Sequence, residues 1–215
     1  NNSKNTPKHL EGEFYYPRLG FGSIFDRIGE YIGSENIHLN SSVQIINHEK
    51  NKVKSVVLEN GDIIMVENLI STMPINILAK SLDPQPPNEI LTFLESIRFR
   101  TIKLCILYLS IDQFTENASI YFPDIGCPFN RIYEPKNRSA EMAPDGKTSI
   151  VIEIPMGKNN INIDIEDDQL FEEVVFYLQS KKLLKKETII KYKIVEVPFA
   201  YPVILKDGGI NLRKS

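Results

Sequence analysis

The sequence predicts an α+β chain in two parts, because short strands and helices fill its first part and long strands dominate its second. Of the 215 residues, 42% are hydrophobic and 25% are charged, which is typical of a globular protein with a sizeable core. A Pro-rich segment at residues 83–87 separates the two parts. This composition excludes a mainly disordered, collagen-like or low-complexity chain.

The first part is expected to begin with a short strand at residues 13–16 and a helix. The turn Gly20-Phe21-Gly22 separates these two elements. Apolar residues then recur at helical spacing between Ser23, a suitable N-cap, and Gly33, a suitable C-cap. We therefore expect a helix over residues 23–32.

Short strands are expected to fill most of the remaining first part. The pair Asn60-Gly61 predicts a hairpin with a type I′ turn, because both central residues of that turn need positive φ. Pro74 fits the first turn of a helix that runs through Leu82. The expected strands are residues 37–39, 43–47, 53–59, 63–66 and 69–73.

The second part is expected to open with a helix at residues 88–97. An amphipathic helix is predicted at residues 167–182, where apolar residues repeat on one face. The expected strands are residues 101–111, 119–122, 131–134, 149–154 and 188–197.

Charge and cysteine content exclude several classes of partner. The 25 basic and 28 acidic residues give a net charge of −3, so no field would draw the chain to nucleic acid or an anionic membrane. No apolar run reaches the roughly 18 residues of a membrane span. Two cysteines are too few for a disulfide framework, and their spacing does not match a zinc site. Cys105 is expected in the core, and Cys127 is expected on a loop as an incidental thiol. We expect no metal site and a cytoplasmic location.

Few residues stand out as candidates for chemistry. Gly20-Phe21-Gly22 partly matches a dinucleotide fingerprint, but Phe25 replaces the third glycine and Leu39-Asn40 stands where an acidic ribose partner belongs. A tight turn into a helix is favoured, although free N–H groups at a helix start can still face a phosphate. Arg98 and Arg100 near a strand start can hold an anion or lie on a solvated edge. No catalytic residue is identified.

Four segments are individually common, but their order along the chain is more specific. They are residues 15–24 with a Pro and a Gly-rich turn, residues 37–43 with Leu39-Asn40 before Val43, the hairpin at residues 60–61, and residues 69–74. Together they resemble the middle section of the flavin-containing amine oxidase superfamily. That group includes protoporphyrinogen oxidases, monoamine oxidases, phytoene desaturases and UDP-galactopyranose mutases.

The resemblance implies a domain organisation. Residues 18–82 would form part of an FAD/NAD(P)-binding-type domain. Residues 88–200 would form a substrate domain, an antiparallel sheet with helices on one side, which a strand at residues 12–17 would join. Residues 201–215 would be a truncated return segment.

The resemblance also implies roles for individual residues. The backbone of Val43 would contact the adenine end of FAD. The segment Ser71-Thr72-Met73-Pro74 would pack near the phosphate and ribose of the cofactor. The turn Gly20-Phe21-Gly22 would lie on the side of the substrate and flavin.

The sequence departs from the family at both cofactor-holding ends. It has no strand–GxGxxG–helix followed by an acidic residue, and Asp207-Gly208-Gly209 is a poor substitute for the Gly-Asp pair near the end of family members. We therefore expect FAD in the parent protein and weak or absent FAD binding by this chain alone. Faces normally covered by the missing ends would favour self-association.

Three functions compete. The first is part of an FAD-dependent oxidoreductase, in which hydride passes from a small-molecule substrate to flavin. The second is a flavin-dependent nucleotide-sugar mutase, in which Arg98, Arg100 and Arg131 would contact the diphosphate. The third is a non-enzymatic α+β binding module or a truncated gene product. A strand–GxGxxG–helix encoded upstream of Asn1 would favour the enzyme fragment.

Overall fold

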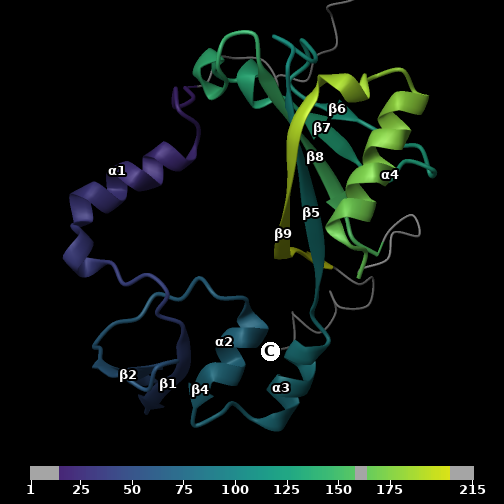
Figure 1. Ribbon diagram of the computed structural model, residues 1–215. Coiled ribbons are helices and arrows are strands. Elements are labelled where there is room, and N and C mark those ends of the chain that lie inside the picture. The colour runs from purple at the N-terminus through teal and green to yellow at the C-terminus, as the bar shows by residue number, and fades with distance from the viewer. Residues whose placement is uncertain (1–14, 158–163, 204–215) are drawn as a thin grey trace, which may run out of the picture. The chain divides into compact units, whose positions relative to one another are not determined.

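The computed structural model describes residues 15–157 and 164–203, which divide into two compact units (Figure 1). Within these ranges, unit 1 contains residues 15–33, 104–157 and 164–195. Unit 2 contains residues 34–103 and 196–203. The family resemblance predicted domains at residues 18–82 and 88–200. These domain boundaries stay a prediction. Residues 12–14 and 204–215, including Asp207-Gly208-Gly209, lie outside the described residues.

Unit 1 is built on a five-stranded sheet in the order β6-β7-β8-β5-β9. Antiparallel pairing joins β6 to β7 and β7 to β8. A helix, α4 (Asp167–Ser180), lies along the sheet (Figure 1). The strands are β5 (Arg98–Leu109), β6 (Ile120–Tyr121), β7 (Arg131–Tyr133), β8 (Thr148–Pro155) and β9 (Ile189–Val203). The short 3₁₀ helices are η3 (Pro135–Asn137), η4 (Ala140–Met142) and η5 (Lys186–Thr188).

The core of unit 1 lies between α4 and one face of this sheet. Leu170, Val174 and Leu178 recur every four residues along α4, so they form one apolar stripe, and all three are buried. Alternate residues of β8 meet this stripe, because successive side chains of a strand point to opposite faces. These residues are Ile150, Ile152 and Ile154. The predicted amphipathic helix and long strands of the second part are confirmed.

Aromatic rings and two thiols complete this core. The ring of Phe129 lies 4.8 Å from that of Phe122 and 5.3 Å from that of Tyr177, both edge to face. Cys105 is buried in β5 as predicted, and its burial raises the pKa of the thiol to about 12. Cys127 follows a turn but is also fully buried, and this burial raises its pKa. Cys127 lies on a loop as predicted, but its burial in the core was not predicted.

Unit 2 contains a four-stranded sheet in the order β3-β2-β1-β4. The strands β1 (Val43–Glu49), β2 (Lys52–Leu58) and β3 (Ile63–Met65) form an antiparallel meander. The helix α2 (Ile75–Ser81) leads to β4 (Leu82–Asp83), a two-residue strand parallel to β1 that the sequence did not predict. The helix α3 (Asn88–Glu95) follows, close to the predicted bounds. The buried apolar residues of unit 2 are Ile46, Val56, Ala79, Leu94 and Ile102.

The two hairpin turns of unit 2 differ from the prediction. Lys50 and Asn51 have φ of 49° and 63°, so the β1–β2 turn is the one with positive φ at both central residues. At Asn60-Gly61 only Gly61 has positive φ, 89°. The N–H of Gly61 donates to the Leu58 carbonyl at 2.9 Å, and that of Leu58 donates to the Asp62 carbonyl at 2.9 Å. The predicted hairpin is present, but its turn is a three-residue loop closed by a glycine in the left-handed region.

Three expected strands are not present as predicted. Residues 37–39 and 69–73 are irregular, and Tyr15 and Tyr16 are likewise outside any strand. Leu39 is 79% exposed and Ile70 is 93% exposed. A strand needs a neighbour to accept its backbone hydrogen bonds, and the described residues supply none to these segments. Strand-forming sequence alone was therefore an insufficient guide here.

The helix α1 (Gly22–Ile32) forms nearly as predicted, but its caps differ. Phe21 occupies the N-cap position without a side-chain capping bond. The Ser23 hydroxyl instead donates to the Gly20 carbonyl at 2.8 Å. Gly33 is the C-cap as predicted, and its N–H donates to the Gly29 carbonyl at 3.1 Å. Pro74 is the N-cap of α2 rather than a residue of its first turn.

Candidate functional site

A group of polar and aromatic side chains lies on the sheet face of unit 1 opposite α4. In β7 and β8, buried Ile132 and Ile152 face the core and alternate with Arg131, Tyr133 and Glu153. Arg131 pairs directly with Glu153 in the antiparallel register. We refer to Tyr121, Arg131, Tyr133 and Glu153 as the Arg131 cluster. Of the predicted site residues, only Arg131 lies in it.

The guanidinium of Arg131 is held on three sides. Its Nη2 lies 2.5 Å from a carboxylate oxygen of Glu153, and the two side chains are 33% and 14% exposed. The guanidinium carbon lies 5.4 Å from the centre of the Tyr133 ring and 6.0 Å from that of Tyr121, within cation–π range. The Arg131 Nε is buried and finds no hydrogen-bond partner among the described residues. This arrangement fixes a cation in one orientation while part of it stays accessible.

The electrostatics of the cluster favour binding over proton transfer. Burial alone would lower the pKa of Arg131, but hydrogen bonds with Tyr121 and Glu153 raise it above its ordinary value. Burial raises the pKa of Tyr133, so its hydroxyl keeps its proton at neutral pH. Glu153 is committed to the ion pair. The cluster thus offers an oriented guanidinium, paired with one carboxylate, and phenol hydroxyls.

The glycine turn before α1 is anchored to the loop around η4. The Arg18 guanidinium forms an ion pair with Glu141 through two contacts, one of them at 2.8 Å. The Ser139 hydroxyl donates to the Arg18 carbonyl at 2.7 Å. Gly20 is buried with φ of 95°, and a Cβ there would lie 2.9 Å from the Met142 sulfur. The positive φ favours glycine, and a methyl group here would require Met142 to shift, so the turn is a packed part of unit 1.

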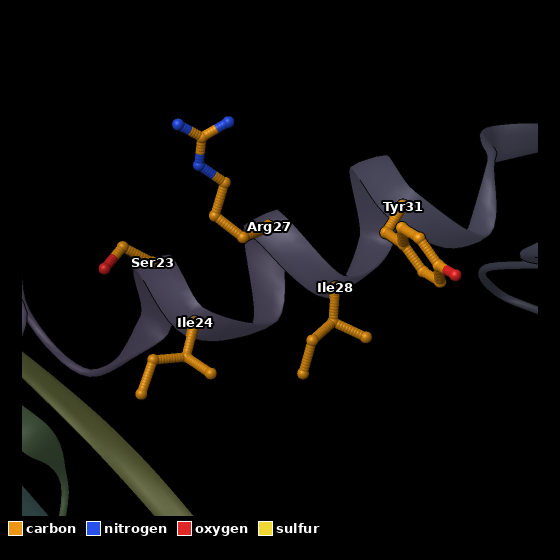
Figure 2. Close-up of a pocket in the computed structure, with 5 residues that line it drawn as sticks. All are labelled: Ser23, Ile24, Arg27, Ile28 and Tyr31. Atoms are coloured by element: carbon orange, nitrogen blue, oxygen red, sulfur yellow. The ribbon is translucent and has the colours of Figure 1, made fainter.

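Beyond this turn, α1 buries none of its residues. Phe21 and Phe25 are both exposed and contact each other edge to face at 5.7 Å. An open hollow of about 430 Å³ lies along the helix and is mostly apolar. Figure 2 shows Ile24 and Ile28 projecting from one side of α1, with Arg27 on the other. The predicted residue Gly22 starts this helix, and a Cβ at position 22 would have no neighbour within 4 Å in the described structure.

The residues that the resemblance assigned to cofactor contact lie in unit 2. Val43 begins β1 and pairs with Leu58. In the segment Ser71-Thr72-Met73-Pro74, the Met73 N–H donates to the Ser71 hydroxyl at 3.3 Å. Ser71 lines a cavity of about 770 Å³ together with His48 and residues of β1, β2 and α2. Val43, Thr72, Met73 and Pro74 do not line it, so the structure does not gather the predicted cofactor contacts at one cavity.

Arg98 and Arg100 begin β5 and are both exposed. They belong to unit 2, whereas Arg131 belongs to unit 1. Phe99 between them contacts Phe199 of β9 edge to face at 5.4 Å. The three predicted anion contacts thus do not form one cluster within either unit.

A buried carboxylate near the cluster escaped the sequence analysis. Glu134 is 1% exposed, and its carboxylate accepts the N–H of Phe114 at 3.0 Å and that of Thr115 at 2.8 Å. The Thr148 hydroxyl donates to the same carboxylate at 2.5 Å. These bonds fasten the loop at residues 112–117 to β7 and β8. Nothing in the local sequence distinguishes this glutamate from a surface one.

Two classes of site have no counterpart in the described residues. No group of three or more His, Cys, Asp or Glu side chains within them is arranged to hold a metal ion. No helix among them is both long and apolar enough to cross a membrane.

A protein-family model described as flavin containing amine oxidoreductase matches residues 5–194. The chain belongs to this family. No curated protein matches the sequence. The predicted resemblance to flavin-containing amine oxidases is therefore confirmed.

Solved structures share the fold of this chain. Reduced UDP-galactopyranose mutase aligns with a TM-score of 0.78 at 20% identity, over 93% of this chain and 43% of its own. A putative protoporphyrinogen oxidase from Exiguobacterium sp. 255-15 aligns with a TM-score of 0.66 at 13% identity, over 91% and 42%. Putrescine oxidase with bound putrescine gives 0.64 at 14% identity, over 81% and 38%. The chain spans less than half of each protein, and the α+β fold class is confirmed.

The described residues do not fit the pyrophosphate of FAD by themselves. That group needs a strand, a glycine turn and a helix in succession. Here the glycine turn at Gly20 follows irregular residues, and the first helical positions are preceded by Phe21, whose backbone is itself helical. The family implies a flavin cofactor, and the described residues do not supply a complete site for its pyrophosphate.

Proposed function

We propose that the chain forms the substrate-side part of an FAD-dependent oxidoreductase, in which hydride passes from a small-molecule substrate to flavin. Flavin supplies the redox chemistry when it is bound. The residues of this chain would bind and orient the substrate. The observation that carries the proposal is the Arg131 cluster, in a chain that belongs to the flavin containing amine oxidoreductase family.

The cluster suits recognition of an anionic or polar group on the substrate. A guanidinium held by a carboxylate and two rings loses little conformational freedom when it binds a ligand. It also presents planar donors that match carboxylate or phosphate oxygens. The protonated Tyr133 hydroxyl adds a neutral donor beside it.

A second candidate function is a flavin-dependent nucleotide-sugar mutase. Two observations favour it: the fold similarity to UDP-galactopyranose mutase and the fixed guanidinium of Arg131. In this function Arg131 would contact the diphosphate of the substrate, and Arg98 and Arg100 would be tested as further contacts. The two functions predict different ligands for the same cluster.

Titration of the chain with UDP distinguishes them. For the mutase we expect saturable binding that weakens at least about tenfold in Arg131→Met, since a charge-assisted contact to phosphate is lost. Arg27→Met is the matched control, because Arg27 is exposed on α1 and pairs only locally with Glu30. Arg98→Met and Arg100→Met test the other two arginines. No UDP binding by the wild-type chain would remove the mutase and leave the oxidoreductase.

Flavin content tests the oxidoreductase. We expect weak or absent binding of FAD by the chain alone, measured by quenching of flavin fluorescence, and tight binding would contradict this expectation. The natural polypeptide that includes this chain should carry bound FAD when purified, and its coding region should contain a strand–GxGxxG–helix. A natural polypeptide without either would favour a non-enzymatic binding module.

We also propose that the isolated chain self-associates. The apolar side chains of α1 and the exposed Ile63 and Met65 of β3 present uncovered apolar surface. Sedimentation velocity should show a concentration-dependent increase in mass. Ile28→Lys should reduce it and Lys185→Met should not, because Ile28 is an exposed apolar residue and Lys185 a polar one. A monomer at all concentrations would contradict the proposal.

A further inference from the structure

A second cavity of unit 1 lies where three strands of its sheet begin or end, and no function described above uses it. It has a volume of about 380 Å³, which suits a small organic molecule. Its walls come from the end of β5, the start of β8, the start of β9 and the loop after η4. We call it the Met142 cavity, after the residue that links it to the glycine turn.

The walls of the Met142 cavity are largely apolar. Leu109, Met142 and Ile190 line it, together with Ala143 and Pro144. Apolar walls of this extent favour the hydrocarbon part of a ligand over a small inorganic ion. Of the polar lining residues, the buried Thr148 is already committed, since its hydroxyl donates to Glu134.

Two lysines provide the charge of this cavity. Lys147 and Lys191 both line it, and both residues are exposed. The Lys191 ammonium lies 4.7 Å from the centre of the Tyr108 ring, in a cation–π contact that directs the lysine over the sheet face. No ion pair involving either lysine is formed within the described part of the chain.

The carboxylates near the cavity are mostly engaged elsewhere. Glu141 pairs with Arg18, and Asp112 pairs with Lys136 at 2.7 Å. Glu134 is buried and accepts three hydrogen-bonding groups. Asp145 shares a turn with Lys147 and is exposed, but the two form no ion pair in the described structure. Among the residues that line the cavity, the only charged ones are Lys147 and Lys191.

We propose that the Met142 cavity binds a small amphipathic anion, with its hydrocarbon part against Met142, Pro144 and Ile190 and its acid group at Lys147 and Lys191. The ligand class is a medium-chain or aryl carboxylate. Binding at such a site gains from apolar burial and from two lysine ammonium groups that form no ion pair within the described residues. This site is separate from the Arg131 cluster, and the proposal does not rest on the proposed function.

The glycine turn positions one wall of this cavity. The buried Gly20 leaves just enough space for the Met142 side chain, whose sulfur would lie 2.9 Å from a Cβ at that position. A side chain at position 20 would displace Met142 and reshape the cavity. The turn that the family resemblance placed on the substrate side therefore acts on the ligand site through packing.

The test uses the whole chain with ¹³C-labelled methionine methyl groups and octanoate as the probe. The chain contains four methionines, and the Met142→Leu variant assigns the Met142 signal. We expect octanoate to shift the Met142 methyl signal saturably, with a Kd of about 1 mM or lower. The Met156 signal reports on folding, because Met156 is buried in the unit 1 core.

Charge variants and neutral probes decide the chemistry of the site. The double variant Lys147→Met/Lys191→Met should weaken octanoate binding at least about tenfold, and Lys147→Arg/Lys191→Arg should largely retain it. Lys193→Met is the matched control, because Lys193 is exposed on the same strand and does not line the cavity. Octanol and inorganic phosphate should each bind far more weakly than octanoate.

Several results would overturn the proposal. They are a Met142 signal that octanoate leaves unchanged or shifts without saturation, equal binding of octanol, equal binding of phosphate, and no effect of the double lysine variant. None of these results involves flavin or UDP. Failure of this proposal is therefore distinguishable from failure of the proposed function.

Discussion

Unit 1 and unit 2 differ in how completely they bury their apolar residues. In unit 1, α4 covers one sheet face, and 15 residues form a continuous buried cluster. In unit 2, strand-like segments at residues 37–39 and 69–73 remain irregular and expose Leu39 and Ile70. Both regions have strand-forming sequence, but residues 37–39 and 69–73 find no neighbouring strand among the described residues. A complete layer therefore decides whether such a sequence becomes a strand.

The comparison predicts its largest effect at Phe129. We expect Phe129→Ala to lower the free energy of unfolding by about 3–5 kcal/mol, because a fully buried ring and its two edge-to-face contacts are lost. Urea unfolding followed by circular dichroism measures this change. Ile70→Ala is the matched variant in unit 2 and should change the free energy by less than about 0.5 kcal/mol. A similar cost at both positions would show that residues 69–73 are packed in solution and would remove the contrast.

A smaller loss of stability is expected at Glu134. Its buried carboxylate holds a loop of unit 1 in place, whereas no such contact is described for the irregular residues 69–73 of unit 2. Glu134→Gln should destabilise the protein by about 2 kcal/mol, because a neutral amide oxygen replaces the charged oxygen that accepts the backbone N–H groups of Phe114 and Thr115. The amide hydrogen-exchange rates of those two residues should rise as well. Glu116→Gln, on the exposed part of the same loop, should leave both quantities unchanged.

The smallest predicted change in stability comes from comparing the packed glycine turn of unit 1 with the exposed helix α1 that follows it. Gly20→Ala should cost about 1–2 kcal/mol, because φ is positive and the new methyl group meets Met142. Gly22→Ala should be neutral or stabilise by up to about 1 kcal/mol, because alanine favours helix and finds open space. The Met142 methyl signal should move in the first variant alone. Equal behaviour of the two variants would mean that the turn is not packed on Met142.

The sequence predicted elements correctly where the chain contains its own partners. The apolar spacing of α4 and the long strands β5 and β8 gave correct elements, since each buries against the others. The segment at residues 69–73 has the same kind of pattern, yet it lacks a strand to pair with in the described residues. Lys50-Asn51 forms the turn with two positive φ values without a glycine, so composition alone did not reveal it.

The candidate site was predictable only in part. Arg131 was named from its possible chemistry, but its partner Glu153 is 22 positions away and is fixed by strand register. Tyr121 reaches the guanidinium because β6 and β7 are neighbours, and Tyr133 reaches it because it lies two positions further along β7. The Met142 cavity combines loop and strand ends from four places in the sequence. Such sites arise from tertiary contacts that periodicity and short motifs do not encode.

The two buried thiols have a practical consequence for labelling. Thiol reagents attack the thiolate, and burial raises the pKa of Cys105 to about 12 and also raises that of Cys127. Both native cysteines should therefore be unreactive toward maleimides in the folded chain at neutral pH. A cysteine introduced at the exposed position 70 would react alone. One fluorophore attached there would report when another polypeptide covers this segment.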